Sequence, residues 1–284
     1  MSNPLAPAAG PALRGRRALV TGASRGIGEA VARRLAGAGA DVVVGCRRHP
    51  DEAAVVAEAI RGLGRRAEVV VADLTTTDGP ARLARAAIAA LGGIDLLVLN
   101  AGEGSRGLPI GRTSAAEVAR HFQLHAGSAH QLLAELLPGL QAAPRADVVA
   151  ISSVAVVARP AGGAPYTMAK AALEALMATL AAEEGVGGVQ AHVVAPGLVA
   201  TEQGRRLVRA LTGGAELEDV EHRLPGGRAL TADDVASAVL GLVSASGARG
   251  VAGRLVLGEG PDDLESLRLL LRGDGALPGG SQAS

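Results

Sequence analysis

Aromatic residues are almost missing from this 284-residue chain, which has one Phe, one Tyr and no Trp. A buried core must therefore be built from Ala, Val, Leu and Ile, within an apolar content of 48%. Cys46 is the only cysteine, so the chain can form neither an internal disulfide nor a thiolate metal cluster. Basic and acidic residues balance at 28 each, and no basic block is present, which argues against nucleic acid as a partner.

Long apolar runs are missing as well. No apolar stretch reaches the roughly 18 residues needed to cross a bilayer. The Pro/Ala-rich start has no basic residues ahead of an apolar segment, so it does not resemble a secretion signal. These absences predict a soluble cytoplasmic protein with no membrane partner.

The composition along the chain predicts one domain with loose ends. We expect a flexible N-terminal arm over 1–15, a single domain over 16–260, and a partly disordered C-terminal extension over 261–284 that contains a short Leu-rich piece. The segment 202–227 mixes Arg, Glu and Gly, and we interpret it as a mobile lid over the substrate.

Short apolar runs alternate with Ala/Leu-rich helical stretches through most of the chain. Strands are expected at 16–20, 41–45, 67–72, 94–99, 147–153, 190–195 and 254–257. Their runs lack polar alternation, which is typical of strands buried on both faces of a parallel sheet. The fold class is therefore α/β, with a single doubly wound parallel sheet and helices on both faces. A capping box at Ser114–Glu117 opens a long helix, expected to end at Pro138-Gly139.

A glycine-rich turn follows the first expected strand, with the sequence Thr21-Gly-Ala-Ser-Arg-Gly-Ile-Gly28. Gly22 permits a tight turn, Gly26 lets the backbone approach a pyrophosphate, and Gly28 lets the next helix pack close. The helix N-terminus then offers free N–H groups to phosphates. The pattern predicts dinucleotide binding; the alternative is a plain turn in a glycine-rich chain.

The end of the second strand bears on which dinucleotide would bind. NAD-preferring folds usually place an acid there, whereas an arginine accommodates a 2′-phosphate. This chain has Cys46 followed by Arg47, and Arg25 lies in the glycine loop. We therefore predict NADP(H); the alternative is that Arg47 and Arg48 are solvated surface charges.

Polar residues at the ends of other strands are further candidates. Asp73 could bind an adenine amino group or cap a turn, and Asn100 follows the fourth strand, where open α/β sheets place ligands. His121 and His125 share a helix face, but no further ligands accompany them, so we expect no metal site.

The single tyrosine, Tyr166, precedes the single lysine, Lys170, by four residues. That spacing puts both side chains on one helix face. A nearby cation would help a phenol, with its ordinary pKa of about 10, to lose its proton. The alternative is a core tyrosine beside a solvated lysine.

Together these motifs resemble the short-chain dehydrogenase/reductase family, over roughly 15–258. The glycine loop resembles the family's cofactor loop, and Asn100-Ala101-Gly102 its motif after the fourth strand. Ser153 stands thirteen residues before Tyr166, as the family's catalytic serine does, and Tyr166-x-x-x-Lys170 is the family's hallmark. Pro196-Gly197 with Thr201 is similar to the segment that holds the nicotinamide amide.

The resemblance implies a role for each residue. Tyr166 would donate a proton to a carbonyl, Ser153 would bind the substrate oxygen, and Lys170 would hold the nicotinamide ribose and lower the pKa of the phenol. The cofactor-binding residues would be Gly22, Ser24, Arg25, Gly26, Ile27, Gly28, Arg47, Asp73, Leu74, Asn100, Ala101, Gly102, Tyr166, Lys170, Pro196, Gly197, Val199 and Thr201.

The chain departs from the family pattern at two places. His125 stands where the family usually has an Asn that anchors a water in the proton relay; a histidine could also hold water, or could merely pack between helices. Gly258-Glu259-Gly260 stands where many members have Asp-Gly-Gly, and this change would affect subunit packing more than chemistry.

The function expected from the resemblance is that of an NADPH-dependent ketoreductase, similar to 3-oxoacyl-carrier-protein reductases and polyketide-tailoring ketoreductases. A dehydrogenase of sugar-like or steroid-like secondary alcohols and a non-catalytic NADP-binding protein are the alternatives. The substrate would be a small carbonyl compound, free or linked to a carrier protein. Three arginines in the lid, Arg205, Arg206 and Arg209, could meet such a carrier or form a solvated helix face. A homotetramer or homodimer is expected.

Overall fold

The computed structural model describes residues 12–224, 226–244 and 253–258. Seven parallel strands form one sheet in the order β3-β2-β1-β4-β5-β6-β7. The strands are β1 (Arg17–Val20), β2 (Asp41–Cys46), β3 (Ala67–Val71), β4 (Leu96–Leu99), β5 (Ala146–Ile151), β6 (Val189–Pro196) and β7 (Gly253–Leu257). The predicted doubly wound sheet is confirmed, and the strand bounds differ from the expected ones by two residues at most.

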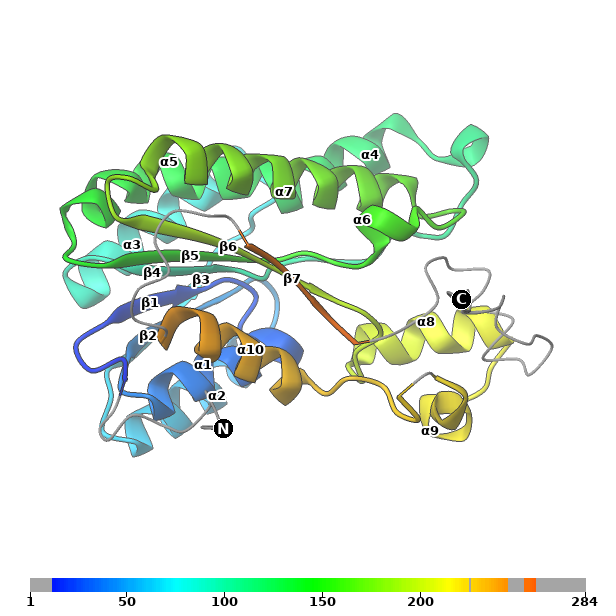
Figure 1. The fold of residues 1–284 in the computed structure, drawn as a ribbon, viewed down its shortest axis with the longest axis horizontal. Coiled ribbons are helices and arrows are strands. Elements are labelled where there is room, and N and C mark those ends of the chain that lie inside the picture. Colours follow the sequence, from blue (N-terminus) through cyan, green and yellow to red (C-terminus); the bar gives the residue numbers. More distant parts are fainter. Residues whose placement is uncertain (1–11, 225, 245–252, 259–284) are drawn as a thin grey trace, which may run out of the picture.

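Helices cover both faces of the sheet (Figure 1). One face carries α1 (Gly26–Gly37), α2 (Pro50–Gly62) and α10 (Ala232–Ser244), and the other carries α3 (Gly79–Leu91), α5 (Ser128–Ala142) and α7 (Ala164–Glu184). Two clusters of buried Ala, Val, Leu and Ile fill these layers, one on each side. The central strands are apolar without alternation because both of their faces are buried.

The expected long helix is interrupted. It consists of α4 (Ala115–Phe122), a π-helical turn over Gln123–Gly127, and α5. The prediction that Pro138-Gly139 ends it is wrong, because α5 continues through Pro138 to Ala142. Leu136 and Leu140 lie on one face and are both 1% exposed, so their burial offsets the hydrogen bond that proline removes.

The inner end of the expected N-terminal arm is packed. Leu13 is 1% exposed, and its N–H donates to the carbonyl of Ala38 over 2.8 Å. The expectation of a flexible arm therefore does not hold at Leu13, whose side chain is buried in the core. The rest of the arm (1–11), residues 259 and 260 and the C-terminal extension lie outside the described residues.

The segment expected to be a lid folds as helices. It contains α8 (Glu202–Thr212), α9 (Leu217–Val220) and a 3₁₀ turn at Glu221–Arg223, and α8 and α9 lie beyond the carboxyl ends of the strands (Figure 1). A separate apolar cluster holds the segment together, made of Val208, Leu217, Val220, Leu224 and Ala229. Its mobility stays a prediction.

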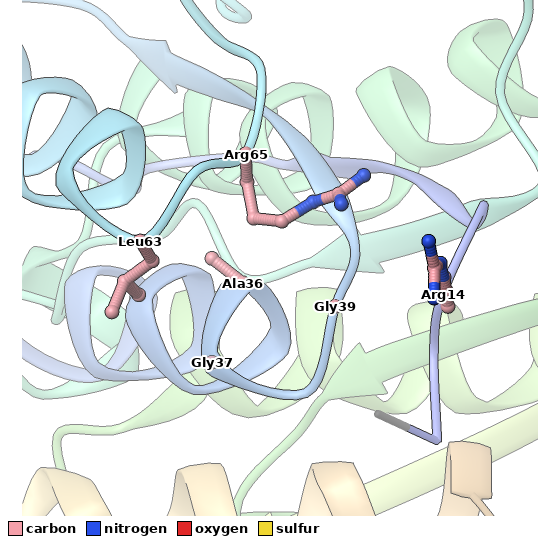
Figure 2. Close-up of a pocket in the computed structure, with 6 residues that line it drawn as sticks. All are labelled: Arg14, Ala36, Gly37, Gly39, Leu63 and Arg65. Atoms are coloured by element: carbon pink, nitrogen blue, oxygen red, sulfur yellow. The ribbon is translucent and has the colours of Figure 1, made fainter. Parts of the chain in front are cut away.

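The strand order reverses between β1 and β4, which is where doubly wound sheets open a crevice for ligands. The glycine loop leaves β1 and Asn100 follows β4, so both flank this crevice. A hollow of about 250 Å³ lined by Arg14, Gly37, Gly39, Leu63 and Arg65, shown in Figure 2, lies instead at the amino ends of the strands. It is therefore separate from the predicted site.

Within the described ranges, no helix is both long and apolar enough to cross a membrane. Over the same ranges, no three His, Cys, Asp or Glu side chains gather in a way that could hold a metal ion.

Candidate active site

The glycine loop is shaped by close backbone contacts. Gly22 and Gly26 have φ of +64° and +61°, a conformation that favours glycine. A Cβ on Gly28 would lie 2.3 Å from the carbonyl oxygen of Gly22 and 2.5 Å from Nδ2 of Asn100. Arg25, which precedes α1, makes no side-chain cap. Within the described part of the chain, the first N–H groups of the helix therefore have no capping side chain, as a phosphate-binding helix requires.

Asn100 holds this loop rather than pointing away from it. Its Nδ2 donates to the carbonyls of Thr21 and Gly22 over 2.9 and 3.0 Å. The hydroxyl of Thr21 accepts in turn from the N–H groups of Asn100 and Ala101. Thr21 is a residue that the sequence did not single out, and it joins the ends of β1 and β4. Both side chains would therefore act on a cofactor through the loop they shape.

Charged residues gather at the outer end of the crevice. Arg47 lies 3.7 Å from Asp73 and 3.6 Å from Glu103, and Arg120 makes a two-point contact with Glu103 at 2.7 and 2.8 Å. Nη1 of Arg47 is buried and has no hydrogen-bond partner among the described residues. Arg47 is therefore not a solvated surface charge. Arg48, next to it, is exposed.

Asp73 adopts one of its two predicted roles. Its Oδ1 accepts from the N–H and the hydroxyl of Thr75 over 2.9 and 2.7 Å, which caps the turn after β3. Burial raises the pKa of Asp73, but the Thr75 hydrogen bonds and the charges of Arg47 and Arg120 outweigh it and lower the pKa overall. A second role toward adenine stays a prediction.

The segment after β6 closes the crevice opposite the glycine loop. Gly197 donates to the carbonyl of Leu257 over 2.9 Å, and Val199 forms a bridge with Leu230. The hydroxyl of Thr201 caps α8 by accepting from Gly204. A Cβ on Gly26 would lie 3.5 Å from Cγ2 of Thr201. The structure thus brings together the glycine loop and the Pro196–Thr201 segment, which are far apart in sequence.

Tyr166, Ser153 and Lys170 meet at the carboxyl end of β5. Pro165 occupies the first turn of α7, where its missing N–H costs nothing, and Tyr166 and Lys170 follow on one face. The Ser153 side chain lies close enough to Tyr166 to lower the pKa of the phenol, and its hydroxyl accepts from the N–H of Ala155 over 3.2 Å. Nζ of Lys170 lies 5.7 Å from the Tyr166 ring centre and donates to the carbonyl of Ile151 over 2.6 Å.

Burial governs the protonation of this group. It raises the pKa of Tyr166 above its ordinary value, and the neighbouring Ser153 side chain opposes that only in part. We expected Lys170 to lower the pKa of the phenol. Without a bound cofactor, burial has the larger effect and the pKa is raised. Burial also lowers the pKa of Lys170, to about 8, against the opposing charge of Glu174. At neutral pH the phenol keeps its proton and most of the lysine is charged.

His125 lies in the π-helical turn, directly beside Tyr166. Its ring meets the Tyr166 ring edge to face at 5.4 Å and stacks on His121 at 5.7 Å. Nε2 lies 3.2 Å from the carbonyl oxygen of Glu103, and Nδ1 is buried without a partner among the described residues. Burial and the charge of Lys170 hold the pKa of His125 well below its ordinary value. The imidazole is therefore neutral.

The tautomer of His125 follows from its partner. A carbonyl oxygen only accepts hydrogen bonds, so Nε2 must carry the proton and Nδ1 is left as an acceptor. A π-helical turn often marks a functional site, and here it aims an imidazole at Tyr166. The sequence placed His125 at this position, but the continuous helical pattern gave no sign of the turn.

These residues form a candidate oxidoreductase site on a doubly wound α/β fold. The chain belongs to the short-chain dehydrogenase family, whose profile matches residues 16–211. It is 31% identical over 222 residues to the 3-oxoacyl-[acyl-carrier-protein] reductase FabG of Aggregatibacter actinomycetemcomitans, covering 78% of this chain and 88% of the relative.

Two solved structures resemble the fold closely. A short-chain dehydrogenase from Burkholderia cenocepacia J2315 in complex with NADP has a TM-score of 0.77 and 30% identity, covering 87% of this chain and 98% of that one. A 7α-hydroxysteroid dehydrogenase complexed with NADH and 7-oxoglycochenodeoxycholic acid has a TM-score of 0.74 and 28% identity, covering 87% and 94%. The two neighbours carry different dinucleotides, so the fold alone does not select one.

Proposed function

We propose that this protein is an NADPH-dependent carbonyl reductase. The observation that supports this most directly is a protonated, partly buried Tyr166 beside Ser153, with Lys170 one helical turn away and its Nζ 5.7 Å from the Tyr166 ring centre. A phenol that keeps its proton is suited to donate it to a carbonyl oxygen.

The chain's own residues suit each part of a reduction. The hydroxyls of Ser153 and Tyr166 would both donate to the substrate oxygen, on which negative charge develops. Ser153 is oriented for this because its oxygen already accepts from Ala155, which leaves its proton to donate. Lys170 would stabilise the phenolate left after proton transfer. When bound, NADPH supplies the hydride to the carbonyl carbon.

The crevice fits a phosphorylated dinucleotide. The uncapped start of α1 suits a pyrophosphate, and Arg47 has a buried nitrogen without a hydrogen-bond partner among the described residues. A guanidinium with an unused donor suits a 2′-phosphate better than a ribose hydroxyl. Arg47 therefore supports the preference for NADPH over NADH.

We propose ketones in general as the substrate class, without restricting it to carrier-linked ones. The lid arginines expected to meet a carrier protein each pair with a glutamate of the same segment: Arg205 with Glu218, Arg206 with Glu202, and Arg209 with Glu216. This favours the alternative of a solvated helix face. Free ketones are therefore the first substrates to test, and carrier-linked ones the second.

A dimer or tetramer is part of the proposal. Phe122 on α4 is 51% exposed and Met168 on α7 is 56% exposed, and these two helices pack against each other. Exposed apolar side chains on adjacent helices suit pairing between copies of the chain. Light scattering on the eluted protein measures the assembly size.

The decisive experiment is a spectrophotometric screen of NADPH oxidation against ketones of graded size, free and carrier-linked. The wild type should turn over at least one ketone, and Tyr166→Phe should abolish that turnover while still binding NADPH. Binding of NADPH without turnover of any carbonyl would favour a non-catalytic role. Turnover of secondary alcohols alone would favour an oxidising dehydrogenase.

A further inference from the structure

Three consecutive residues at the end of β5 are each tied to another element. The carbonyl of Ile151 accepts from Nζ of Lys170 over 2.6 Å. The hydroxyl of Ser152 donates to Oε1 of Glu174 over 2.5 Å. The carbonyl of Ser153 accepts from Nη2 of Arg254 over 3.2 Å. The strand end that carries the catalytic serine is therefore bonded to both α7 and β7.

Glu174 is the centre of this network. It follows Lys170 by four residues, so Tyr166, Lys170 and Glu174 form one stripe along α7. Its carboxylate accepts from Ser152 and, through both oxygens at 3.1 Å, from Nε of Arg254. The Glu174 side chain is 17% exposed and that of Arg254 is 27% exposed. Such a sheltered pair loses little of its charge interaction to solvent.

We propose that Glu174, held in place by Arg254, is a positioning residue that keeps Lys170 charged and fixes the Ser153 peptide beside Tyr166. This inference rests on the catalytic roles proposed above for Ser153, Tyr166 and Lys170. It adds Glu174 and Arg254 as residues that act through them without touching substrate.

The charges that face Lys170 determine what Glu174 does. Burial lowers the pKa of Lys170 to about 8. Glu174 on the same helix is the anion that opposes this, while His125 on the π-helical turn is neutral and Tyr166 is protonated. Arg254 on β7 partly neutralises Glu174. Loss of the carboxylate should therefore lower the lysine pKa, and loss of the guanidinium should raise it.

The single lysine of the chain allows a direct test. Protein labelled with ¹³C-lysine gives one side-chain signal, and its titration followed by NMR reports the pKa of Lys170. Glu174→Gln should lower that pKa by about one unit, and Arg254→Met should raise it. Glu174→Asp, which keeps the charge, should restore most of the wild-type value. Glu183→Gln, an exposed position on the same helix, is the matched control.

The opposite signs separate an electrostatic role from damage to the fold, since a general loosening would shift both variants the same way. A Glu174→Gln titration that matches Glu183→Gln would overturn the inference, and so would a downward shift in Arg254→Met. A kinetic arm follows: because charged Lys170 is the active form, the alkaline fall in kcat should move to lower pH in Glu174→Gln. The NMR titration needs no substrate. It therefore tests the effect of Glu174 on the pKa of Lys170 even if the protein proves not to reduce carbonyl compounds.

Discussion

The imidazole of His125 meets the phenol of Tyr166 edge to face, with ring centres 5.4 Å apart and planes at 89°. An edge-to-face pair fixes the orientation of both rings. A Cβ on Gly102 would lie 2.6 Å from Cε1 of His125, so the motif after β4 packs directly on the imidazole. Nδ1 of His125 has no partner among the described residues and is free to accept, and the charge of Lys170 is close enough to lower the pKa of the imidazole. We therefore propose that His125 takes part in proton transfer.

His125→Ala should therefore lower kcat by roughly 10- to 100-fold, the range of lost acid–base assistance. His125→Asn should retain more activity, because an amide can still donate to the Glu103 carbonyl and accept from water. Steady-state kinetics with the ketone found in the screen measures both. His130→Ala, at an exposed position on α5, is the control. Wild-type turnover in His125→Ala would remove His125 from the mechanism.

A second prediction concerns the glycine loop. Gly28→Ala places a Cβ against the Gly22 carbonyl and the Asn100 amide, which are held by backbone and hydrogen bonds and cannot give way easily. We expect a loss of about 1–3 kcal/mol of stability and weaker NADPH binding. Gly37→Ala, in the same helix with no heavy atom within 4 Å, should leave the unfolding midpoint unchanged or slightly raised. Equal unfolding midpoints for Gly28→Ala and Gly37→Ala would show that the glycine loop can move to make room for the added methyl group.

A third prediction concerns the choice of dinucleotide. Arg47→Ser should raise the KM for NADPH by roughly 10- to 100-fold, the loss expected for a charge-assisted hydrogen bond. The KM for NADH should change little, because NADH has no 2′-phosphate. Arg48→Ser is the matched control, since that side chain is exposed. Equal changes toward both cofactors would count against a phosphate contact at Arg47.

The sequence predicted most of the fold because its signals were local. Apolar runs without alternation located the strands, and the Tyr166–Lys170 spacing located the helix that presents both side chains. Spacing could not reveal the π-helical turn, because α4 and α5 continue one helical pattern through it. The end of α5 was missed because burial of Leu140 outweighs the local effect of Pro138.

Residues that act across the fold were missed for a different reason. Arg254 and Glu174 are 80 positions apart, and no local pattern links a residue on the edge strand to a helix. Glu174 alone carried a usable signal, since it repeats the four-residue spacing of Tyr166 and Lys170. Glu103 and Arg120 contact each other only because the loop after β4 folds back onto α4.

The last prediction concerns acid stability, at the end of the sheet opposite the active site. Asp147 is fully buried and accepts from Arg16 at 2.8 Å, Arg145 at 3.1 Å and His192 at 3.3 Å. Burial alone would raise the pKa of Asp147, but the bonds to His192 and Arg16 and the nearby charges lower it overall. A lowered pKa stabilises the fold above the unfolded value of about 3.9, and this contribution is lost as pH falls through the folded value.

Asp147→Asn should therefore be less stable than the wild type at pH 7, by about 3 kcal/mol, because it leaves the partly buried Arg16 and Arg145 short of a partner. Its stability should also fall less steeply below about pH 4, since the carboxylate that would be protonated is gone. Urea unfolding at pH 7, 5 and 3.5 measures both effects. Asp78→Asn, an exposed position paired with Arg82, should follow the wild type at each pH. If Asp147→Asn also followed it, the ionised Asp147 carboxylate would contribute nothing to folding, and Arg16 would be satisfied by Asp95 alone.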